Sequence, residues 1–190
     1  MSNDIQLRSI ELRSEVTPKG VLTGYASIYG AYADLGAFVE TFASGSFDKT
    51  LADRNTDVRS FWNHDSGKLL GRQSNGTLRI GSDSTGLEFE VDLPNTTDGN
   101  DVRKLAERGD IGGVSIGFRA DGQKWGRLGS RELRTHTSVA ALIEISPCSI
   151  PVYSATSVQL RSLEHITTQG ADLRTQILCA KTRNYRKVSN

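Results

Sequence analysis

TLRI-GSDSTG-LEFEVDL, residues 77–93, is the stretch of this sequence that decides the fold class. In the last seven residues, apolar and acidic side chains alternate, so one face is aliphatic or aromatic and the other is charged. This period of two predicts a half-buried β-strand. The polar hexapeptide bounded by glycines at 81 and 86 predicts a turn that pairs this strand with residues 77–80 as a β-hairpin. Pro94 ends the second arm.

Further elements are predicted on both sides of this hairpin. A second hairpin is predicted from residues 5–16 and 21–28, which are joined by the turn-forming sequence Thr17-Pro-Lys-Gly20. The apolar pattern changes register within the first arm, and a bulge would absorb this change. Further strands are predicted at 58–63, 111–119 and 131–145, with a loop at Asp121-Gly122. Helices are predicted at 46–54, capped by Ser46, and at 98–108, capped by Asp98 or Asn100 and stopped by Gly109. The pattern is that of an α+β, β-rich domain with few helices.

Composition and charge exclude several classes of protein. The formal net charge of the 190 residues is +1, which argues against a nucleic-acid partner. Two cysteines do not make a disulfide framework, the first residues do not form a secretory signal, and the longest apolar run, 139–143, is too short for a membrane span. We therefore expect a soluble intracellular protein with no membrane partner.

The end of the chain differs from the rest. After about Ser157 the apolar pattern fades, and residues 161–190 hold six Lys or Arg residues against two acidic ones. We expect a folded domain over 1–158 and a basic, flexible C-terminal tail over 159–190.

Ser115 is the first candidate for chemistry. It lies in Ile111-Gly-Gly-Val-Ser-Ile-Gly-Phe118, where glycines would let a substrate backbone approach and leave amides free for an oxyanion. A serine hydroxyl is a poor nucleophile until a neighbouring base takes its proton. The competing interpretation is a small residue in a tightly packed strand. The match to G-x-S-x-G is coincidental, because turn-forming residues rather than a helix follow it.

His64 and Glu144 are the candidates for base and orienting acid. His64 follows a predicted strand, and imidazole has a pKa suited to general base catalysis, although a loop histidine bonded to a neighbour is the competing reading. Glu144 lies among three aliphatic residues, either as an outward-facing acid or as the group that orients a histidine. His136, on the same predicted strand, remains a candidate for base or third member. His165 lies in the tail.

Other candidate sites are weaker. Cys148 offers a thiol, but a small cysteine is more often a packing residue. His64, Asp65 and His136 lack the close spacing of metal ligands, and no phosphate loop or dinucleotide fingerprint is present. We expect neither a cofactor nor a metal.

Several of these segments together resemble the phage prohead (head maturation) protease family, whose fold is similar to that of the herpesvirus assemblin proteases. The resemblance runs from about Leu22 to Thr156. Its motifs are short, and their order along one chain is what makes it specific: Gly24-Tyr-Ala-Ser27, Phe38-Val-Glu40, Gly45-Ser-Phe-Asp48, Asn63-His-Asp65, Leu70-Gly-Arg72, the 76–94 hairpin, the 108–118 segment, Glu144-Ile-Ser-Pro147 and Ile150-Pro-Val-Tyr153.

The resemblance implies a serine endopeptidase with a mainly antiparallel, barrel-like sheet and a few surrounding helices. It places the family's histidine on His64 and its serine on Ser115. The third position falls on Glu144, although the herpesvirus relatives use a second histidine, which keeps His136 open.

The implied substrate is the major capsid protein or its scaffolding segment, cleaved in the immature prohead in the host cytoplasm. Self-cleavage in the tail is also implied, and a homo-oligomer is left open. The alternatives are a non-enzymatic capsid scaffold or decoration module, and an esterase-like hydrolase with His136 or His165 as base.

Overall fold

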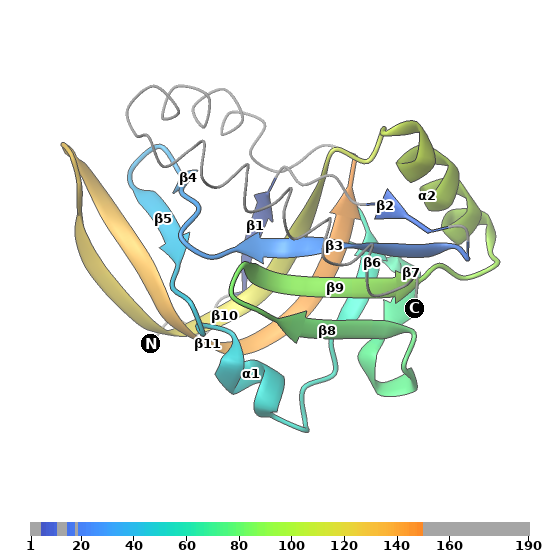
Figure 1. Ribbon diagram of the computed structural model, residues 1–190, viewed down its shortest axis with the longest axis horizontal. Coiled ribbons are helices and arrows are strands. Elements are labelled where there is room, and N and C mark those ends of the chain that lie inside the picture. Colours follow the sequence, from blue (N-terminus) through green and yellow to red (C-terminus); the bar gives the residue numbers. More distant parts are fainter. Residues whose placement is uncertain (1–4, 11–14, 18, 150–190) are drawn as a thin grey trace, which may run out of the picture. The chain divides into compact units, whose positions relative to one another are not determined.

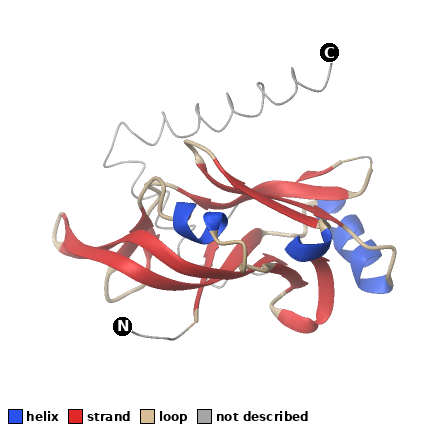
Figure 2. Ribbon diagram, turned by 90° about the horizontal axis from the view of Figure 1, so that it is seen from below, coloured by secondary structure: helices blue, strands red, loops and turns tan. Residues whose placement is uncertain are grey.

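The computed structural model describes residues 5–10, 15–17 and 19–149, and strands make up most of this part of the chain (Figure 2). The strands form two sheets. The first, sheet A, has the order β1-β10-β11-β5-β4, with β6 pairing β11 and β7 pairing β6. The second, sheet B, has the order β2-β3-β9-β8. The expected domain boundary near 158 and the tail over 159–190 lie outside the described residues.

Sheet B is built around the hairpin that decides the fold class. The elements are β2 (Glu15–Val16), β3 (Val21–Ile28), β8 (Leu78–Ser82) and β9 (Gly86–Asp92), all antiparallel. Along β9, apolar residues are buried and acidic residues are exposed in strict alternation, as the sequence predicts.

Sheet A carries the longest strands. It contains β1 (Gln6–Ile10), β4 (Ala33–Asp34), β5 (Val39–Phe42), β6 (Arg59–Trp62), β7 (Asp65–Arg72), β10 (Gly113–Leu128) and β11 (Arg131–Cys148). Figure 1 shows β10 and β11 as a long hairpin that runs past the strands of sheet B. β11 pairs in parallel with both β5 and β6, so sheet A is mixed.

Three helical segments complete the described chain. They are α1 (Asp48–Ala52), the 3₁₀ turn η1 (Gln73–Asn75) and α2 (Thr97–Arg108). Thr96 caps α2 by accepting from the Gly99 amide, and Gly109 ends the helix with a positive φ of 81°. The predicted stop at Gly109 is confirmed, but the predicted caps of both helices are wrong: Asp98 and Asn100 lie inside the first turn of α2, and Phe47, not Ser46, is the N-cap of α1.

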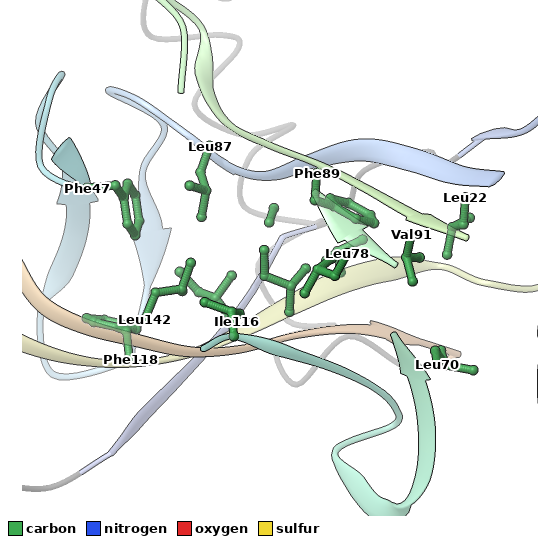
Figure 3. Packing of buried hydrophobic residues seen from close by; sticks show 14 of the residues in the cluster. Leu22, Phe47, Leu70, Leu78, Leu87, Phe89, Val91, Ile116, Phe118 and Leu142 are labelled. Atoms are coloured by element: carbon green, nitrogen blue, oxygen red, sulfur yellow. The ribbon is translucent and has the colours of Figure 1, made fainter. Parts of the chain in front are cut away.

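The core lies between the two sheets. Figure 3 shows Leu87, Phe89 and Val91 of sheet B facing Ile116, Phe118 and Leu142 of sheet A. Each such large apolar side chain stabilises the fold by roughly 1.5–3 kcal/mol when it leaves water.

The fold is β-rich with few helices, as expected, but the expectation of a barrel-like sheet is not confirmed. A barrel requires one sheet whose first and last strands pair. Among the described residues, sheets A and B share no paired strand, and each ends in edge strands.

Candidate active site

Ser115 lies on the face of β10 that points away from the core. Val114, Ile116 and Phe118 belong to the core cluster, so by the strand period of two Ser115 projects from the opposite face. The antiparallel register places Ser115 beside Ser146 of β11 and Gly117 beside Glu144. Cross-strand partners share a face, so Ser115, Ser146 and Glu144 project to the same side of sheet A.

Gly117 lets the Glu144 side chain lie across β10. A Cβ at position 117 would be 2.7 Å from Cγ of Glu144, which is closer than two carbon atoms can approach. Glycine at this position therefore leaves the space in which the carboxylate lies.

His64 is held by a tight turn between β6 and β7. Trp62 pairs with Asp65, so Asn63 and His64 are the two central residues, with φ values of 53° and 62°. Positive φ at both positions is the geometry of a type I′ turn, in which asparagine is favoured and histidine is uncommon. The Asn63 amide donates to the carbonyl of Pro147 (3.1 Å), which ties the turn to the end of β11. Strained backbone of this kind is frequent at functional sites.

The structure brings His64 and Glu144 together. Nδ1 of His64 lies 2.7 Å from Oε1 of Glu144, and because a carboxylate only accepts, the ring donates through Nδ1–H. The other carboxylate oxygen, Oε2, accepts from Oγ of Ser146 at 3.1 Å. Within the described chain, the remaining ring nitrogen, Nε2 of His64, is buried and has no hydrogen-bond partner.

Two neighbours on β11 favour the charged form of His64. The Cys148 side chain and then the Glu144 carboxylate raise the pKa of His64 from 6.5 to about 10, against the opposing effect of burial. The Glu144 carboxylate supplies an opposite charge beside the ring, which favours the imidazolium.

These two partners also locate the imidazole along β11. Glu144 and Cys148 flank Ser146 on one face of the strand, and Ser146 is the cross-strand neighbour of Ser115. The ring therefore lies over the same stretch of β11 as Ser146, while the Ser115 hydroxyl donates to the carbonyl of Arg8 in β1 (3.1 Å). Ser115 is fully buried.

His136, the alternative third member, lies in a different cluster. Its Nε2 is 2.9 Å from Oε2 of Glu40, and its ring stacks on Phe42. Arg8 and Arg134 also bind Glu40, which is only 1% exposed. His136 pairs with Gln123, whereas Ser115 pairs with Ser146, ten residues further along β11. The His136 ring contacts Phe42 and Phe118 of the core cluster, whereas Ser115 projects from the opposite face of β10.

Among the described residues, no group of three or more His, Cys, Asp or Glu side chains could hold a metal ion. No helix in the described ranges has the length and apolar character to cross a bilayer.

Sequence reasoning named Ser115, His64 and Glu144 but missed the roles of Ser146 and Arg8. The register of the strands brings Ser146 to the Glu144 carboxylate and the Arg8 carbonyl to Ser115. A single sequence does not encode register directly. The Asn63-His64 pair was the one available signal, since asparagine at a strand end favours a two-residue turn.

A serine, a histidine and a carboxylate are the three groups that a serine hydrolase uses, and here the histidine pairs with the carboxylate on the face of sheet A from which the serine projects. The family model described as caudovirus prohead serine protease matches residues 4–169, and the chain belongs to this family. The resemblance drawn from the sequence is thereby confirmed, and with it membership of a class of serine peptidases. No match was found among the curated proteins or the solved structures.

Proposed function

We propose that this chain is a serine endopeptidase of prohead maturation in which Ser115 is the nucleophile, His64 the general base and Glu144 the acid that orients it. The single observation that carries these roles is the 2.7 Å contact between His64 and Glu144 on the face from which Ser115 projects. It supports Glu144 rather than His136 as third member, because His136 is bound to Glu40.

The mechanism is acyl transfer. Neutral His64 takes the proton of the Ser115 hydroxyl through Nε2, and Oγ attacks the scissile carbonyl. Glu144 keeps the ring oriented and stabilises the imidazolium that forms. The imidazolium then protonates the leaving amine, and water releases the acyl group from Ser115 by the reverse proton path.

The substrate that fits the family is a capsid protein or its scaffolding segment, and the place of action is the interior of the prohead in the host cell. Cleavage of this chain itself, including the basic tail after about residue 158, is part of the same proposal. Its motivation is the change of composition in the tail.

The test is processing of co-expressed capsid precursor by Ser115→Ala. Loss of the nucleophile is expected to lower the cleavage rate by on the order of 10⁴-fold or more. Ser60→Ala is the matched control, because Ser60 is also fully buried, lies on β6 and has a hydroxyl with no partner in the described chain. Complete processing by Ser115→Ala would reject the proposal.

Self-cleavage is tested on the same pair of proteins. Intact-mass analysis over time is expected to show shortened wild-type chain and unchanged Ser115→Ala chain. Equal masses for both proteins would reject autoproteolysis but leave cleavage of the capsid precursor standing.

A further inference from the structure

Strand β1 occupies the edge of β10 beside Ser115. Residues 6–10 pair antiparallel with residues 114–118, and Ser9 is the register partner of Ser115. β1 is the last strand on this side of sheet A. If β1 were absent, this part of β10 would present a row of unpaired backbone groups, which is how many proteins bind an extended peptide as an added strand.

One carbonyl of β1 is bound by the Ser115 hydroxyl. This hydroxyl donates to the carbonyl oxygen of Arg8, the carbonyl of the Arg8–Ser9 peptide bond, at 3.1 Å. The contact is a hydrogen bond to the carbonyl oxygen, whereas a nucleophilic serine attacks the carbonyl carbon. β1 therefore occupies the Ser115 hydroxyl and the edge of β10 beside it with an extended backbone.

The burial of Ser115 requires that something move before catalysis. Its exposed fraction is zero, so an incoming carbonyl cannot reach Oγ in this arrangement. β1 is the described segment that both pairs with the Ser115 backbone and bonds to its hydroxyl.

The attachment of β1 is suited to release. The side chains described in β1, Gln6 to Ser9, lie outside the core cluster. Its main side-chain anchor is Arg8, which binds both carboxylate oxygens of Glu40 and lies over the Phe118 ring. When Arg8 leaves, Glu40 keeps Arg134 and His136, so no buried charge is left unpaired.

We propose that β1 is a displaceable internal strand that occupies the substrate site, and that substrate binds by antiparallel pairing with residues 114–118 of β10 once β1 has detached. The occupant is an extended segment of protein substrate whose backbone takes the place of β1 beside Ser115. This inference rests on Ser115 being the nucleophile of the proposed function.

The proposal gives a specific kinetic expectation for the full chain carrying Arg8→Ala. Under the proposal, substrate binds only the state in which β1 has detached. When this state is a minor one, the apparent affinity for substrate rises in proportion to the population of that state. A tenfold rise in that population, equal to about 1.4 kcal/mol, lowers KM about tenfold and changes kcat little. Arg131→Ala is the matched control, because it removes an arginine bonded to Asp34 at the other end of sheet A.

A binding measurement tests the same strand without turnover. A fluorescent peptide with the sequence of residues 5–10 is titrated into full-length Ser115→Ala and into Ser115→Ala carrying Arg8→Ala. The expected result is that the peptide binds the double variant at least about tenfold more tightly than it binds Ser115→Ala alone. A scrambled peptide is expected to bind neither protein. If Arg8→Ala does not fold, competitive inhibition of the wild-type protein by the peptide replaces this comparison.

The outcomes separate the two proposals. If turnover depends on Ser115 but Arg8→Ala changes neither KM nor peptide affinity, the role of β1 is overturned and the peptidase assignment stands. If turnover is independent of Ser115, the proposed function falls. Absence of competitive inhibition by the peptide at millimolar concentration overturns the role of β1 in the wild-type protein.

Discussion

The contact between His64 and Glu144 makes a quantitative prediction for Glu144→Gln. Glutamine keeps the size of the side chain and an oxygen that can accept from Nδ1, but removes the negative charge 2.7 Å from the ring. An opposite charge at this range typically shifts a pKa by about 1–3 units. Because the carboxylate stabilises the imidazolium, its removal lowers the pKa of His64 from the present value of about 10 towards 6.5.

Two measurements check this shift. The acid limb of kcat/KM against pH reports the pKa of the base in the free protein, and in the wild type it should lie well above pH 6.5. In Glu144→Gln the limb should move down by about 1–3 units, while the plateau falls by roughly 10²–10⁴-fold because the imidazolium that forms during acyl transfer loses its opposite charge. The chain has three histidines, so ring titration by NMR follows His64 independently of activity.

The control is Glu90→Gln, which removes an exposed carboxylate from sheet B that pairs with Arg79. It should leave both the acid limb and the His64 titration unchanged. An equal His64 titration midpoint in the wild type and in Glu144→Gln would refute the reasoning, because the Glu144 charge would then not stabilise the imidazolium.

Three further predictions concern the nucleophile, acid stability and the core. Cys148→Ala should keep cleavage within about an order of magnitude of the wild type, because the hydroxyl and not the thiol attacks; a loss as large as that of Ser115→Ala in the same assay would reverse this assignment. Burial raises the pKa of Glu40, but its bonds to His136 and Arg8 outweigh burial and lower the pKa from 4.5 to about 2. The resulting stability, roughly 3 kcal/mol, is present above pH 4.5 and is lost as the pH falls towards 2; urea midpoints measured at pH 6 and pH 3 should show the loss, and Glu40→Gln should show a flatter pH dependence. Phe89→Ala removes a side chain that is 1% exposed and should lower the free energy of unfolding by about 3–5 kcal/mol in urea titrations, whereas a change below 1 kcal/mol would contradict its place in the core.

Local alternation predicted the centre of the fold. The 77–93 hairpin, the strand leading to His64 and the helix ending at Gly109 are present close to their expected bounds. In each case the determining signal lies within the segment itself: a period of two, a turn-forming sequence or a glycine with positive φ.

Elements that depend on distant partners were not predicted. Residues 5–16 were expected as one arm of a hairpin, but β1 pairs with β10 in sheet A while β2 pairs with β3 in sheet B. The bulge expected where the apolar pattern changes register, between Leu7 and Ile10, is not formed, because residues 6–10 pair with β10 without a shift of register. The strand β5 was missed because all four of its residues are buried, which removes the alternation that marks a strand.

The β10–β11 hairpin shows a different limit. A loop was expected at Asp121-Gly122, but β10 continues to Leu128 through shifts of register on both sides of Gly122. Asp and Gly together favour a turn, and here that preference is accommodated by an irregularity within a continuous strand.

The candidate site was predicted as three residue types but not as a geometry. The sequence named Glu144 and His136 as candidates for the third position. Choosing between them requires knowing which acid contacts which histidine, and the structure pairs Glu144 with His64 and Glu40 with His136. Such pairing follows from the register of β10 and β11 and from the turn at Asn63-His64, which are long-range properties of the chain.

The place of β1 beside Ser115 has a consequence for when cleavage begins. A strand tethered to its own binding edge competes at an effective concentration in the millimolar range, whereas dilute free substrate in the cell cannot match it. Many copies of a target segment confined in one small volume would reach comparable levels. Under the proposed displacement, crowding alone would delay proteolysis until the particle has closed around its contents.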